Sequence, residues 1–367
     1  MANPSHNERL DELLSTGESN VDQAESQPDL LKQIQRFAEF DGPLEFDFTV
    51  AWWFFGIGAL LIACGGALYW LGSIALLDAL SYRLQIAPLW ITLGIALIGL
   101  ALAGGSLIWI NSTSDRLPTL SRNIARLSSF YHNGLKYVDE TPGQTLNRLN
   151  TQFGDYKRGN YSRELHESIQ GTFLGSLRAI PYEYHHLHYV EQRTVVTVVS
   201  DGKGGTKTVT QIVYDHYDRY SLVLDFPWVT GISVRSDGHS HNDFAYGMDT
   251  ASPDFNRAFS LTGLSEMACA KFIRPSTVLH LLGLFKLLNS FNLEFAETGK
   301  LCISFSNDDL LSFGTQYSLL APQQFYTEIS KGVELPRLMS VLRWGHALTE
   351  LHDDNFSTST PPINQEN

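Results

Sequence analysis

Histidine is the residue type in this sequence with the clearest capacity for chemistry. Six of the twelve histidines lie in one stretch of the chain, at His185, His186, His188, His216, His239 and His241. Neutral imidazoles bind zinc, and a zinc-bound water can act as a nucleophile in hydrolysis. Because side chains alternate along a strand, His186 and His188 would share one face of it. This stretch carries the hypothesis of a metal-dependent hydrolase.

The second histidine string, at residues 239–243, resembles the HxHxD metal loop of metallo-β-lactamases. That motif continues with a histidine, whereas this chain has Phe244. The αβ-layered scaffold that presents the motif is also missing, and a polar surface loop is the favoured interpretation. The sequence therefore predicts no metal ion, no cofactor and no catalytic residue. Under the hydrolase alternative, the metal ligands would be His186, His188, His239, His241 and Asp243.

Other short motifs fail on spacing. A zinc-protease helix beginning at His166 would need a second histidine one turn later, and that position holds Gln170. The glycine-rich segment 202–207 lies between two predicted strands, so it lacks the helix that follows a phosphate-binding loop. Three scattered cysteines are too few for a disulfide framework or a thiolate metal site. No motif in the sequence indicates an enzyme.

Two long apolar stretches are the strongest feature among the elements. No charged residue lies within residues 52–77 or 85–114. A helix needs about 20 apolar residues to cross about 30 Å of hydrocarbon, so we expect spans at about 51–73 and 87–110. Without an ionisable group in the apolar cores, this transmembrane hairpin is predicted to be an anchor and not a transporter. Glycines in both spans would let the helices approach closely, namely Gly56, Gly58, Gly65, Gly66, Gly94, Gly99, Gly104 and Gly105.

Charge is concentrated in the two tails. The net charge is −13, of which residues 1–50 carry −8 and residues 353–367 carry −3. This leaves no basic surface for phosphates, so nucleic acid is not an expected partner. Five basic residues flank the outer ends of the spans and one, Arg83, lies in the turn. The positive-inside rule then places both termini in the cytoplasm.

The soluble part groups its helices and strands, which indicates an α+β fold with a mostly antiparallel sheet packed by helices. The predicted strands are 189–199, 206–217, 220–226, 292–297 and 300–306, and the predicted helices are 29–40, 117–136, 162–177, 275–290 and 322–351, the last interrupted near Pro336. We expect the helix at 275–290 to pack Leu279, Leu282 and Phe285 on the sheet.

The predicted organisation has six parts. They are an acidic N-terminal region with one amphipathic helix (1–48), whose first 25 residues are expected to be disordered, the hairpin (49–112), a helical segment (113–178), a sheet-plus-helix domain (179–320), a C-terminal helix (321–352) and a disordered acidic tail (353–367).

Four segments in order resemble a bacterial family of two-span membrane proteins, catalogued as domain of unknown function three-one-three-seven and sometimes labelled galanin. The segments are 222–226 (LVLDF), 252–259 (SPDFNRAF), 274–279 (RPSTVL) and 301–305 (LCISF). The resemblance extends from Tyr189 to the last helix, about half of the chain. Arg274 stands where the family commonly has threonine, and the histidine-rich strand is also a departure.

This resemblance implies a multi-pass protein of the bacterial cytoplasmic (inner) membrane with a cytosolic domain, and it adds no catalytic residue. It also implies a protein partner, such as a LemA-like membrane protein. The main hypothesis is therefore a membrane-anchored scaffold or adaptor without catalysis, whose partners are the lipid bilayer and another protein. The alternatives are the metal-dependent hydrolase and a ligand-binding domain with a pocket between sheet and helices.

Overall fold

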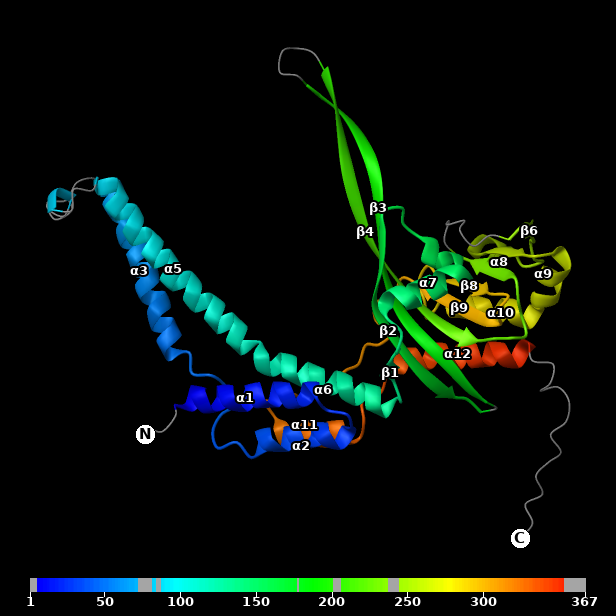
Figure 1. Cartoon of the computed structure of the whole chain (residues 1–367), viewed down its shortest axis with the longest axis horizontal. Helices are drawn as coiled ribbons and strands as arrows, with labels where there is room; N and C mark the ends of the chain where they lie inside the picture. The colour runs from blue at the N-terminus through cyan, green and yellow to red at the C-terminus, as the bar shows by residue number, and fades with distance from the viewer. Residues whose placement is uncertain are drawn as a thin grey trace, which may run out of the picture. The chain divides into compact units, whose positions relative to one another are not determined.

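The computed structural model describes residues 5–71, 81–83, 87–176, 178–200, 206–236 and 244–352. The chain forms two compact units (Figure 1). The first comprises Met1–Tyr131 and Gly314–Val333, and the second comprises His132–Phe313 and Glu334–Asn367. Each unit is described separately below.

The first unit is built from helices. They are α1 (His6–Asp22), α2 (Gln27–Ala38), α3 (Thr49–Leu71), α5 (Pro88–Ser114), α6 (Arg116–His132) and α11 (Pro322–Ser330). Gly17 of α1 permits close packing, since a Cβ atom there would lie 3.0 Å from the ring of Phe37 in α2. Gln27 at the start of α2 donates hydrogen bonds to Ser128 of α6 and to the carbonyl of Ile329 in α11. Helices from both ends of the chain therefore belong to one unit.

Helix α1 corrects the prediction that the first 25 residues are disordered. Ser5 and Glu8 form a reciprocal capping box, which satisfies free amide groups at the helix start. Leu10, Leu14 and Val21 recur at helical spacing and are buried. The prediction of disorder was wrong, because it rested on the acidic composition of this segment and overlooked the apolar residues at helical spacing.

Helices α3 and α5 are long and apolar enough to cross a membrane, by length and composition. They pack against each other through a subset of their glycines. A Cβ atom on Gly99 would lie 2.7 Å from the carbonyl oxygen of Gly58, and one on Gly65 would lie 3.2 Å from that of Thr92. The predicted close approach is confirmed at Gly58, Gly65 and Gly99, whereas Gly56, Gly66, Gly94, Gly104 and Gly105 meet nothing within 4 Å.

The second unit contains one nine-stranded sheet among the described residues, with antiparallel pairing throughout and strand order β1-β2-β3-β4-β9-β8-β5-β7-β6. The strands are β1 (Lys136–Tyr137), β2 (Ser162–Leu174), β3 (Ala179–Ser200), β4 (Thr206–Asp225), β5 (Ile232–Arg235), β6 (Tyr246–Gly247), β7 (Ser260–Gly263), β8 (Asn292–Phe295) and β9 (Lys300–Phe305). The α+β class with an antiparallel sheet is therefore confirmed.

Helices cover both faces of this sheet. Its helices are α7 (Pro142–Gln152), the 3₁₀ helix η1 (Gly154–Lys157), α8 (Pro253–Ala258), α9 (Glu266–Phe272), α10 (Pro275–Leu284) and α12 (Pro336–His352). Gly345 of α12 leaves room for Leu224 on one face. On the other face, α7 and η1 close a core of Leu149, Phe153, Tyr156, Leu165, Leu187, Tyr189, Val223, Ala296 and Cys302.

The helix predicted at 162–177 is wrong, because this segment is strand β2. Leu165 and Ile169 are four residues apart and would share a helix face. In the structure β2 pairs with β3, and a bulge between Leu165 and Glu167 turns these two side chains to opposite faces of the sheet. The tertiary pairing with β3, which no local pattern reveals, decides the conformation. The predicted helical segment 113–178 therefore contains a long strand.

Helix α10 forms as predicted but is shorter and buries a different face. Leu281 and Leu284 are fully buried, whereas Leu279 is 72% exposed and Phe285 is 40% exposed. The ring of His280 stacks on Trp344 of α12, and Nε1 of that tryptophan donates a hydrogen bond to the carbonyl of His280. This contact with α12 sets the rotation of α10. The predicted packing face of Leu279, Leu282 and Phe285 was wrong.

Candidate functional site

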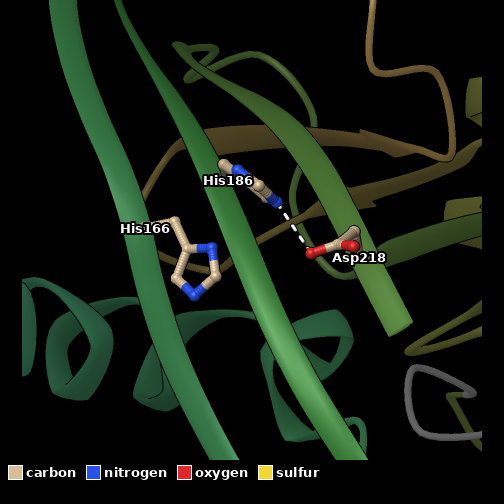
Figure 2. Close-up of side chains that lie close together, drawn as sticks. All are labelled: His166, His186 and Asp218. Atoms are coloured by element: carbon tan, nitrogen blue, oxygen red, sulfur yellow. Dashed lines mark hydrogen bonds and ion pairs between the residues drawn. The ribbon is translucent and has the colours of Figure 1, made fainter. Parts of the chain in front are cut away.

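Four histidines and one aspartate meet on one face of the sheet, where β2, β3 and β4 lie side by side. Figure 2 shows three of these side chains, His166, His186 and Asp218. We call this group the histidine patch. It consists of His166 of β2, His186 and His188 of β3, and His216 and Asp218 of β4. In the antiparallel register His188 lies opposite Asp218, and His186 lies opposite Tyr220. Because side chains alternate along a strand, the even-numbered side chains of β3 and β4 in this region point to the same face of the sheet.

Asp218 is the hub of the patch. Its Oδ1 lies 2.8 Å from Nε2 of His186 and 3.0 Å from Nδ1 of His188. The other nitrogen of His188, Nε2, lies 3.1 Å from Nδ1 of His216. The ring of His166 stacks on that of His188, with 5.0 Å between centroids. Burial opposes ionisation of Asp218, but hydrogen bonds from His188 and His186 hold its pKa below the ordinary value. The patch is therefore a connected array around a carboxylate.

This array has the composition of a metal site. His166, His186 and Asp218 each offer one ligand atom, and these atoms all lie within 4.8 Å of one another. Imidazole nitrogen and carboxylate oxygen are common zinc ligands. The side chains of His186 and His188 are 22% exposed and that of Asp218 is 47% exposed, so solvent ions reach the patch.

The structure brings together only part of the ligand set of the hydrolase alternative. His186 and His188 both join the patch, whereas His239, His241 and Asp243 lie outside the described residues. His185 faces the opposite way and is fully buried. Its ring nitrogens lie 3.0 Å from Ser168 and from Glu183, and burial lowers its pKa.

Sequence reasoning missed the roles of His166 and Asp218. His166 was assigned to a helix, so its position next to β3 could not be anticipated. One signal in the sequence could have placed Asp218. Once the register of the β3–β4 hairpin is fixed, residues 216, 218 and 220 lie opposite residues 190, 188 and 186, and alternation puts all six side chains on one face.

The opposite face of β4 carries a buried charge network. Asp155 of η1 accepts a hydrogen bond from Nε of Arg219 at 2.9 Å and pairs with Arg158 at 2.5 Å. Asn292 of β8 adds a third donor at 3.1 Å. Burial disfavours the Asp155 carboxylate, but Arg219 and Arg158 hold its pKa below the ordinary value. This network connects η1 to β4 and β8.

Glu294 completes the network from β8. Its two carboxyl oxygens accept hydrogen bonds from the amides of Gly154 and Asp155, at 2.6 and 2.9 Å. Burial, with a further contribution from the negative charge of Asp155, raises the pKa of Glu294 to about 8. The charged groups of this network are bonded to other groups of the same unit, which is typical of a structural network.

Strands β3 and β4 extend beyond the rest of the sheet as a two-stranded arm, residues 191–200 and 206–217 (Figure 1). Among the described strands, β3 pairs with β2 only up to Val190, and β4 pairs with β9 only from Tyr220. The face that continues from the histidine patch exposes the apolar side chains Val196, Val198, Ile212 and Tyr214.

Comparison with known proteins gives no further assignment: no family model, curated protein or solved structure matches the chain. The resemblance to the two-span membrane family stays a prediction.

Proposed function

We propose that this chain is a membrane-anchored scaffold or adaptor, in which α3 and α5 form a transmembrane hairpin and the second unit lies in the cytoplasm. The observation that carries the proposal is the exposure of the two apolar helices. In their most apolar stretches only 17% and 22% of the residues are buried. The core helix of a soluble protein would be mostly buried, whereas a lipid-facing helix leaves its apolar side chains uncovered by protein.

Aromatic side chains support the same proposal. Trp53 near the start of α3 and Trp70 near its end are 70% and 89% exposed. Trp90 near the start of α5 and Trp109 near its end are exposed as well. Amphipathic rings at both ends of an apolar helix are typical of the headgroup zones of a membrane. The spacing of these rings fits helices that cross the bilayer once each.

The arm is the surface that we assign to a protein partner. A two-stranded ribbon with exposed valine, isoleucine and tyrosine gains little stability of its own. A contiguous group of exposed apolar side chains often marks a surface that binds another protein, whereas single exposed leucines or valines need no such explanation. A partner that covers Val196 and Ile212 would remove them from water. The family resemblance makes a LemA-like membrane protein the first candidate.

Site-specific photocrosslinking in intact membranes tests this function. A photoreactive phenylalanine analogue at Val196 or at Ile212 should give one discrete adduct, because both positions lie on the face of the arm that continues from the histidine patch. Arg193 is the control, since its exposed side chain points to the other face and pairs with Asp215. Absence of an adduct from both apolar positions, or equal yields at Arg193, would contradict the assignment of the partner surface.

A further inference from the structure

We propose that the histidine patch binds one divalent transition-metal ion of the zinc class, with one imidazole nitrogen each from His166 and His186 and one carboxylate oxygen from Asp218 as protein ligands. This inference does not depend on the membrane anchor or on a protein partner. It rests on the convergence of three ligand atoms from three neighbouring strands.

The distances between the ligand atoms of the patch bracket those found around a zinc ion. Zinc binds nitrogen and oxygen at about 2.0–2.2 Å, so the ligand atoms of a tetrahedral site lie about 3.3 Å apart. Nε2 of His186 and Oδ1 of Asp218 are 2.8 Å apart as hydrogen-bonded partners, and all three ligand atoms lie within 4.8 Å. For His186 to bind through Nε2, its ring proton must lie on Nδ1, so the ion would replace the hydrogen bond between His186 and Asp218.

His188 and His216 support these ligands from the side. Nδ1 of His188 contacts the same carboxylate oxygen of Asp218, while its ring stacks on His166 with an interplanar angle of 10°. Its Nε2 is held by His216. Groups that fix the orientation of ligands raise metal affinity, and removing one costs about 10–100-fold. His188 is thus a positioning residue that contacts two of the three ligands.

The donor types and charge select the kind of ion. Two neutral imidazoles and one carboxylate favour zinc, copper, nickel or iron over magnesium and calcium, which prefer oxygen donors alone. Water from the exposed side would fill the remaining coordination positions.

Because of its position in the fold, a bound ion would restrict the motion of the strands at the base of the arm. The ligands lie on β2, β3 and β4, immediately before the arm leaves the sheet at Val190. A bound ion would cross-link β2, β3 and β4 at the base of the arm. It would thereby reduce hydrogen–deuterium exchange in this part of the sheet.

Metal titration of the full chain in mild detergent tests the proposal. The chain is purified without a polyhistidine tag, stripped with a chelator, and titrated with zinc chloride against a chromophoric competitor. We expect one tightly bound zinc per chain. Asp218→Asn, His166→Ala and His186→Ala should each weaken binding by more than about 100-fold, and His188→Ala by about 10–100-fold. His132→Ala is the control, because His132 is exposed and lies outside the patch.

X-ray absorption of the zinc-loaded chain gives a second readout. The spectrum should show nitrogen and oxygen at about 2.0–2.2 Å and no sulfur shell at about 2.3 Å. Asp218→Asn keeps the side-chain shape, so a native melting temperature of its metal-free form would exclude misfolding as the cause of lost binding. The absence of stoichiometric zinc from the folded native chain would overturn the proposal, as would tight binding that survives in a His166→Ala, His186→Ala, Asp218→Asn chain.

Discussion

At the scale of residues, β4 separates two kinds of polar chemistry by alternation. Asp218 points to the solvent-facing histidine patch, whereas its neighbour Arg219 points to the buried network around Asp155. The first group is reachable by ions, and the second is held by hydrogen bonds within the fold. Burial therefore distinguishes the proposed binding site from the structural network, although both are arranged around an aspartate.

Removing Asp155 should destabilise the second unit strongly. Asp155→Ala leaves Arg158 and Arg219 buried without this counter-charge, which costs about 3–5 kcal/mol. Asp254→Ala is a matched control, because Asp254 also pairs with an arginine three positions later but both side chains are at least 75% exposed. This control should lose less than about 1 kcal/mol. Hydrogen–deuterium exchange of the strand amides measures both values, and equal losses would refute the structural role of the network.

Glu294 should make the second unit less stable as pH rises. Its pKa is about 8 in the folded chain against an ordinary value of 4.5, so the folded state binds more protons between these two values. The stability from protonated Glu294 is complete below pH 4.5 and is lost progressively up to pH 8. The unfolding free energy of Glu294→Gln, minus that of the native chain, should therefore increase between about pH 5 and pH 8. A difference that stays flat over this window would contradict the raised pKa.

At the scale of elements, local sequence pattern predicted the apolar helices and four of the nine described strands, β3, β4, β8 and β9, but not the other five strands or the pairing across the sheet. The break between α11 and α12 at Pro336, the strand pair 292–306 and both long apolar helices were predicted and are confirmed. Strand β2 was mistaken for a helix because its conformation depends on pairing with β3. For the same reason the sequence could not place His166 beside His186, so the predicted ligand set contained only His186 and His188 of the patch.

Helix α10 offers a direct test of how the second unit packs. Leu281→Ala empties a fully buried position and should cost about 2–5 kcal/mol. Leu279→Ala changes the same residue type two positions earlier, where the side chain is exposed to solvent, and should cost less than about 0.5 kcal/mol. Thermal unfolding monitored by exchange of the β8 and β9 amides compares the two variants. A larger loss in Leu279→Ala would restore the packing face predicted from sequence.

The pairing of α3 with α5 should depend on one glycine contact. Gly99→Val places a branched side chain against the backbone of Gly58, where even a Cβ atom would approach to 2.7 Å, so the helices must separate. Gly94→Val adds the same volume where nothing lies within 4 Å and should leave the pair intact. Distances between spin labels on the two helices in detergent measure the effect. Similar distances in both variants would show that close glycine packing is not required.

At the scale of the whole molecule, the chain combines an apolar helix pair with a domain that extends an arm from its sheet. The two units differ in how much apolar surface they expose. The first leaves tryptophans and leucines of α3 and α5 exposed, whereas the second covers its core with helices on both faces of the sheet. A bilayer around α3 and α5 would satisfy the first unit. With the hairpin in a bilayer, the basic residues that flank the spans would favour the cytoplasmic side for both termini, which is the orientation that we propose.

The most direct test of this central claim is alkaline phosphatase fused at two points in a bacterial host, since the enzyme is active only after export. A fusion after Arg83, in the turn between the two apolar helices, should be active because that turn is expected outside the cytoplasm. A fusion after residue 360 should be inactive but expressed at a comparable level. An inactive fusion at Arg83 would contradict the transmembrane hairpin, and an active fusion at the C-terminal end would contradict its orientation.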